Sequence, residues 1–161
     1  MVAQHKNQAN LAMYRNTEVN TANRLKLLIM LYEGTLRFGQ RAEDALAAGN
    51  LAEKGVMISK MLAIVSELRS TLDHGKAPEV AGNLERLYEF IHEKLVQANI
   101  RNDVQLLRDA MRVLRILHSA WVEVSRKPQA ELAVKQPDSQ AEAVKKASTG
   151  AQADNYVHLS V

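Results

Sequence analysis

The sequence contains no cysteine and few aromatic residues, and both absences narrow the classes of protein it can belong to. Without cysteine there is neither a disulfide framework nor a thiolate metal site. Aromatic residues make up only 4% of the 161 residues, whereas Ala, Leu, Glu, Lys, Arg and Gln are abundant, and this composition favours helix over sheet. A chain of this length is typical of one domain with its own hydrophobic core.

The sequence also lacks long apolar runs and a concentration of charge of one sign. No apolar run approaches the length of a membrane span, and residues 1–20 lack the apolar region of a signal peptide, so we expect no direct membrane insertion and a cytoplasmic protein. The net charge is only +3, and basic and acidic residues are interspersed. The charge pattern therefore does not indicate nucleic-acid binding, although the pI of about 9.2 leaves it open.

The most apolar stretch of the chain is Leu25–Phe38, within which the six consecutive residues Leu27–Tyr32 are all apolar or aromatic. It lies inside a longer helical pattern. Because a helix turns about 100° per residue, six consecutive apolar residues surround its whole circumference. This helix therefore has more apolar surface than one packing face needs. Either it is buried on all sides, or part of it is kept for another molecule.

Apolar residues recur at steps of three and four through four segments, which predicts four helices. Capping residues and chain breaks place them at about 21–48, 51–72, 79–99 and 103–125, with the first beginning near Asn20 or Thr21. Short loops between consecutive helices favour antiparallel neighbours. We therefore predict an all-α protein whose residues 21–126 form an antiparallel, up-down four-helix bundle.

The two ends of the chain differ from the predicted bundle in composition. Residues 1–20 are polar with isolated apolar points, so they form either a disordered lead-in or an extended N-terminal arm docked on the bundle. Residues 127–161 are low in hydrophobicity and are predicted to be a disordered C-terminal tail, with at most a transient helix near 139–148.

Few residues have the pattern of a catalytic or metal site. A di-iron bundle needs two Glu-x-x-His motifs, but the sequence has one, Glu89 and His92, and His118 is preceded at that spacing by Arg115. No serine follows a glycine-rich turn, and no glycine loop suits a phosphate. We therefore expect no enzyme activity, no metal and no cofactor. A metal-dependent bundle enzyme is the alternative that elemental analysis would decide.

Basic residues line one side of the fourth predicted helix at Arg108, Arg112 and Arg115. Aromatic residues are not interleaved with them, so the pattern is a weak indication of nucleic-acid binding. A solvated face with acidic partners on neighbouring turns explains it better.

Two long motifs in this sequence resemble the flagellar secretion chaperones of the FliS type. The first combines Tyr14, Val19, Thr21-Ala22 and the stretch Leu28–Phe38, and the second runs from Tyr88 through Ala98-Asn99 to Asn102-Asp103. Ala120-Trp121 completes the pattern, so the resemblance covers about residues 11–125. It implies an antiparallel helical bundle.

The resemblance also implies a function and partners. Proteins of this type bind the C-terminal segment of flagellin in the cytoplasm, prevent its premature polymerisation, and deliver it to a membrane protein of the flagellar type III export gate. Their N-terminal arm can cover the cargo groove when cargo is absent. Carried over to this sequence, Tyr14, Val19 and Met13 would form the cap and compete with cargo.

The residues that contact cargo cannot be separated from core residues by type alone, because both are apolar. We expect them beside the core stripes, at Met57 and Ile64 in the second helix and at Val113 and Ile116 in the fourth. The alternative use of the same surface is self-association, which would make the protein a helical scaffold and a homodimer.

Overall fold

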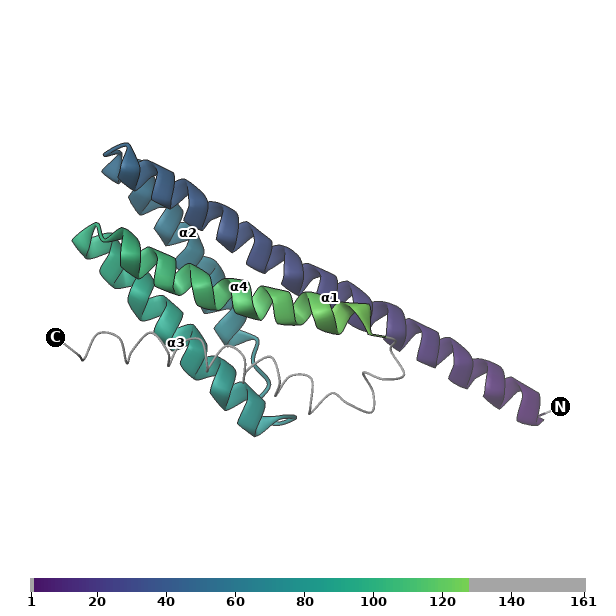
Figure 1. The fold of residues 1–161 in the computed structure, drawn as a ribbon. Coiled ribbons are helices and arrows are strands. Elements are labelled where there is room, and N and C mark those ends of the chain that lie inside the picture. Colours follow the sequence, from purple (N-terminus) through teal and green to yellow (C-terminus); the bar gives the residue numbers. More distant parts are fainter. Residues whose placement is uncertain (1, 128–161) are drawn as a thin grey trace.

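The computed structural model describes the backbone of residues 2–127 and the side chains of residues 6–127, and this part of the chain is four helices (Figure 1). They are α1 (Val2–Ala47), α2 (Leu51–Ser70), α3 (Pro78–Arg101) and α4 (Val104–Arg126). Each packs against the next, and α1 also packs against α4, which closes the bundle. The predicted all-α, antiparallel four-helix fold is confirmed.

Polar side chains and one left-handed residue cap helix ends from Asn50 onward. Asn50 accepts a hydrogen bond from the backbone N–H of Glu53 at the start of α2. Asp103 accepts from the N–H groups of Gln105 and Leu106 at the start of α4. Between α3 and α4, Asn102 adopts the left-handed conformation (φ 52°) that ends a helix.

The predicted start of the first helix near Thr21 is wrong, because α1 begins at Val2. The hydroxyl of Thr17 donates to the carbonyl of Met13, and that of Thr21 donates to the carbonyl of Thr17. Thr21 therefore occupies the interior of a helix, where its hydroxyl bonds back one turn. The N-terminal arm is helical rather than extended, and it projects past the other helices at one end of the bundle (Figure 1).

The core lies along the bundle axis and receives side chains from all four helices. Its largest fully buried members are Tyr32, Tyr88, Ile58, Met61, Ile91, Leu95, Leu107, Met111, Leu114 and Leu117. The apolar run in α1 is divided between core and surface: Tyr32 is fully buried, whereas Leu27, Met30 and Leu31 are exposed. The surplus apolar surface predicted for this helix therefore exists.

The predicted tail, residues 127–161, lies outside the described residues except for Lys127. Lys127 follows the last turn of α4 with extended backbone angles (φ −78°, ψ 141°). A following proline, here Pro128, disfavours helical angles at the residue before it.

Candidate functional site

The most prominent apolar surface of the bundle itself is a stripe on α1 formed by Leu27, Met30 and Leu31. Their exposed fractions are 60%, 53% and 37%. Steps of three and one residues keep them on one side of the helix, while Leu28 and Tyr32 lie toward the core. We call these three residues the α1 outer stripe. Contiguous exposed apolar side chains on a soluble helix are typical of a partner-binding surface.

Two contacts show which residues of α2 lie beside this side of α1. The ammonium of Lys60 lies 5.2 Å from the ring centroid of Phe38, and Arg41 forms an ion pair with Glu53 at 2.7 Å. Because α1 and α2 are antiparallel, residue 64, one turn beyond Lys60, comes level with residues 30–34 of α1. The half-buried Ile64 therefore lies level with the α1 outer stripe.

The other three expected cargo residues on α2 and α4 are placed differently. Met57 and Val113 are each only 2% exposed and belong to the core, so in this structure neither offers surface to a partner. Ile116 is half-buried and lines a shallow depression on α4 with Arg115, Ser119, Ala120 and Glu123. Ile116 lies about 140° around α4 from Met111, which approaches α1 at Gly39, so the depression is separate from the α1 outer stripe.

The three residues expected to cap the groove lie on the projecting part of α1. Met13, Tyr14 and Val19 are 70%, 58% and 59% exposed. They are therefore not docked over the bundle in this structure. Sequence reasoning did not name the α1 outer stripe as a site, although the continuous apolar run Leu27–Tyr32 was the signal that could have identified it.

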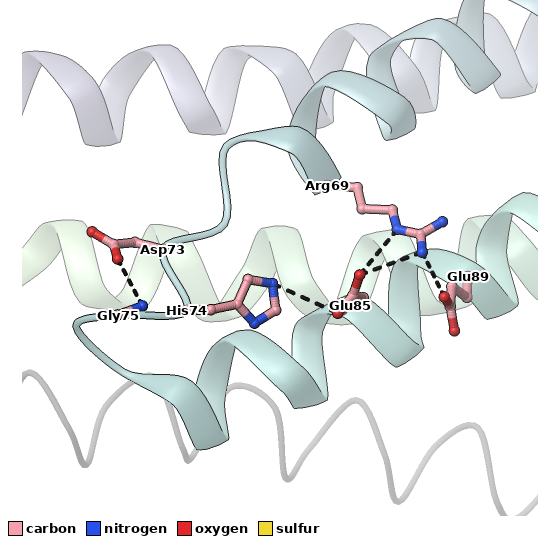
Figure 2. A network of polar contacts seen from close by, with 6 residues as sticks. All are labelled: Arg69, Asp73, His74, Gly75, Glu85 and Glu89. Carbon is pink, nitrogen blue, oxygen red and sulfur yellow. Dashed lines mark hydrogen bonds and ion pairs between the residues drawn. The ribbon is translucent and has the colours of Figure 1, made fainter.

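Polar residues on the surface pair mainly with one another, as the corner between α2 and α3 shows (Figure 2). Arg69 donates to Glu85 and, at 2.6 Å, to Glu89, while His74 lies 3.6 Å from Glu85. Asp73 accepts from the backbone N–H of Gly75 and holds the turn. Glu89, the carboxylate of the single Glu-x-x-His motif, is thus engaged by a guanidinium group.

Two of the three basic residues on one side of α4, Arg108 and Arg112, have acidic neighbours. Arg108 donates to Glu43 of α1, and Arg112 lies 3.7 Å from Asp109. Among residues 6–127, no group of three or more His, Cys, Asp or Glu side chains is placed to hold a metal ion. None of the helices in the described part of the chain is long and apolar enough to cross a membrane.

Several residues of the two motifs have structural roles. The hydroxyl of Tyr32 lies 2.6 Å from that of Tyr88 in the core. The ammonium of Lys54, on a side chain that is almost fully buried, donates to the carbonyl of Asn99 and to the side chain of Asn102 at 2.8 and 2.7 Å. Lys54 therefore fixes the corner between α3 and α4, which contains the end of the second motif.

Comparison with known proteins decides what this bundle is. Residues 6–128 match the family model described as "Flagellar protein FliS". The chain belongs to the FliS family. The resemblance carried by the two motifs is therefore confirmed, and the family gives this chain a chaperone role in flagellar export.

Relatives from several bacteria align with this FliS-family chain over about two thirds of its length. The flagellar secretion chaperone FliSB of Pseudomonas aeruginosa is 37% identical over 108 residues, which is 67% of this chain and 86% of the relative. The flagellar secretion chaperone FliS of Salmonella typhimurium is 34% identical over 110 residues, 68% of this chain and 82% of the relative. That of Campylobacter jejuni is 35% identical over 119 residues, 73% of this chain and 93% of the relative.

Proposed function

We propose that this FliS-family chain is a cytoplasmic export chaperone for flagellin. It binds the C-terminal segment of flagellin, prevents polymerisation before export, and delivers its cargo to the membrane export gate of the flagellar type III apparatus. The family and its role in flagellar export support this proposal. The structural observation that carries it is the α1 outer stripe, which leaves Leu27, Met30 and Leu31 available to a partner.

The physical basis of binding is burial of an amphipathic segment. The end of flagellin becomes helical in the filament, and before assembly its apolar face has to be covered. Fully burying one large aliphatic side chain contributes about 1.5–3 kcal/mol. Ordering a disordered segment on binding costs about 2–5 kcal/mol or more. This cost weakens the complex, so the cargo can be released without a nucleotide.

The cargo surface that we propose centres on the α1 outer stripe and extends to Ile64 on α2. The depression around Ile116 on α4 is a second contact for a cargo chain that wraps around the bundle. Met13, Tyr14 and Val19 lie exposed on the projecting part of α1, where they can contact cargo or fold back as a cap. Met57 and Val113 are left out because they are buried in the core.

The direct experiment is size-exclusion chromatography of the chain with the C-terminal segment of flagellin at micromolar concentration. We expect the two to elute together in a stable complex. Separate elution of the two components would contradict the proposal. A segment taken from the middle of flagellin is the matched control and should elute alone.

The same exposed stripe also supports the alternative that the protein is a scaffold that self-associates. Light scattering with and without the flagellin segment separates the two functions. If the α1 outer stripe serves cargo, any homodimer built on it dissociates when the segment is added. A homodimer that persists unchanged beside bound cargo would show that self-association uses another surface.

A further inference from the structure

Gly34 lies in the interior of α1, at the end of the α1 outer stripe. It follows Met30 by four residues and Leu31 by three, so it lies one turn farther along the same side of the helix. Glycine destabilises the interior of a helix relative to alanine, because its backbone loses more conformational freedom on folding. A glycine at this position of α1 therefore needs a physical reason.

Neither the backbone conformation nor the packing of this chain requires glycine at position 34. In the described part of the chain, the glycine with positive φ is Gly49. A Cβ atom at Gly34 would meet only Nη2 of Arg37, at 3.8 Å, which is an ordinary contact with the end of a flexible side chain. At Gly39, by contrast, a Cβ atom would lie 2.8 Å from Sδ of the buried Met111. The packing of the chain thus explains Gly39 but not Gly34.

Apolar side chains border the space above Gly34. The α1 outer stripe lies one turn before it, and the half-buried Phe38 lies one turn after it. Ile64 of α2, also half-buried, lies level with residues 30–34. Gly34 therefore leaves helix backbone uncovered among larger apolar side chains. We call this place the Gly34 notch.

Two basic side chains also border the Gly34 notch. The guanidinium of Arg37 is the group nearest to the missing Cβ atom, and the ammonium of Lys60 lies 5.2 Å from the ring centroid of Phe38. Glu33 lies toward α4, where it meets a histidine. Basic groups beside an apolar surface favour a partner segment that carries an acidic residue beside its apolar ones.

We propose that the Gly34 notch is the point at which the backbone of the bound segment comes closest to α1. The segment is an amphipathic helix that places a small residue, Gly, Ala or Ser, opposite Gly34 and an acidic residue beside Arg37. Small side chains on both helices are needed, because the side chains at a contact set the distance between two helix axes. Position 34 thus selects cargo by the size of one side chain. This inference rests on the proposed function, since the segment is the flagellin segment proposed above.

Calorimetric titration of the C-terminal segment of flagellin into the unaltered full chain, Gly34→Ala and Gly34→Leu tests the size selection. Both substitutions should keep or raise thermal stability, because both residues favour helix. We expect Gly34→Leu to bind at least about tenfold more weakly and Gly34→Ala about threefold more weakly, since the added atoms fill the point of closest approach. On a flat apolar surface the added side chain would instead strengthen binding, so the sign of the change decides.

The matched control is Ala52→Leu, which adds an apolar side chain at an exposed position of α2, about three turns before Ile64. It should bind as the unaltered chain does. Equal or tighter binding by Gly34→Leu and Gly34→Ala, with helical content intact, would overturn the inference and leave the proposed function standing. No binding by the unaltered chain would overturn both.

The acidic residue of the segment is tested by salt. Affinity for the flagellin segment should fall as the salt concentration rises, because salt screens the attraction between Arg37 and a carboxylate. Arg37→Gln should make this fall smaller. The same salt dependence in Arg37→Gln and in the unaltered chain would overturn the placement of an acidic residue beside Arg37.

Discussion

The hydroxyl oxygens of Tyr32 and Tyr88 lie 2.6 Å apart at the centre of the bundle and join α1 to α3. These two helices are diagonal neighbours, since each packs mainly against α2 and α4. Both side chains are almost completely buried. The hydrogen bond satisfies two hydroxyl groups that would otherwise be costly in an apolar core.

The tyrosine pair should make stability depend on pH in the alkaline range. Burial raises the pKa of Tyr88 to about 12, and burial together with Tyr88 raises the pKa of Tyr32 well above its ordinary value. The unfolded chain ionises near pH 10, so the stabilisation is complete below about pH 10 and is lost as the pH rises toward 12. Urea unfolding followed by the fluorescence of Trp121, the only tryptophan, measures this loss.

The matched variant is Tyr32→Phe/Tyr88→Phe, which removes both titrating groups and keeps the rings. Its free energy of unfolding should fall less between about pH 8 and about pH 11 than that of the unaltered chain. An identical fall in both proteins would show that the buried pair is not the source of the pH dependence.

Replacing Lys54 should destabilise the bundle through the corner between α3 and α4. Lys54→Met keeps the aliphatic stem but leaves the carbonyl of Asn99 and the side chain of Asn102 without their donor. We expect a loss of about 1–3 kcal/mol in the free energy of unfolding. Lys76→Met, at a side chain that is 87% exposed, is the control and should change stability by less than about 0.5 kcal/mol. Similar values for both variants would refute the role given to Lys54.

Replacement by alanine should stabilise the chain at one glycine of α1 but not at another. A Cβ atom at Gly39 would lie 2.8 Å from Sδ of the buried Met111, whereas one at Gly34 meets only Arg37, at 3.8 Å. Gly34→Ala should therefore stabilise by about 0.5–1 kcal/mol through helix propensity. Gly39→Ala has to displace Met111 at a cost of about 1–3 kcal/mol, which cancels or exceeds that gain. Thermal unfolding of both variants checks the difference, and equal stabilisation would mean that α1 and α4 do not approach closely at Gly39.

Much of the fold could be predicted from the sequence, because the spacing of apolar residues and the residues at helix ends indicated the same four helices. The predicted break between residues 48 and 51 contains Asn50, which caps α2, and the fourth helix was predicted to begin at residue 103, where Asp103 caps α4. Thr21 led to a wrong prediction of where the first helix begins. Threonine suits an N-cap, but it also suits a helix interior where its hydroxyl donates to a carbonyl one turn back. The seven-residue spacing from Leu11 to Tyr32 was the better guide, since it continues across the wrongly predicted boundary.

The candidate site was harder to predict, because core and surface positions carry the same residue types. Met57 and Ile64 are two turns apart on α2, but one is buried and the other half-buried. A neighbouring helix covers one side of an apolar stripe and leaves the other side exposed. Which side is covered depends on how the helices pack, and the spacing of apolar residues does not reveal this. The surplus of apolar residues in Leu27–Tyr32 was visible in sequence, but its division into Tyr32 inside and the α1 outer stripe outside required the arrangement of the bundle.

The most direct test of the account is a calorimetric titration of the C-terminal segment of flagellin into the unaltered chain and into Leu27→Ser/Leu31→Ser. Ile100→Ser, at an apolar side chain that is 74% exposed elsewhere on the bundle, is the matched control. We predict that the double variant binds at least about tenfold more weakly while Ile100→Ser binds as the unaltered chain does. Unchanged affinity in the double variant, with its helical content intact, would contradict the assignment of cargo binding to the α1 outer stripe.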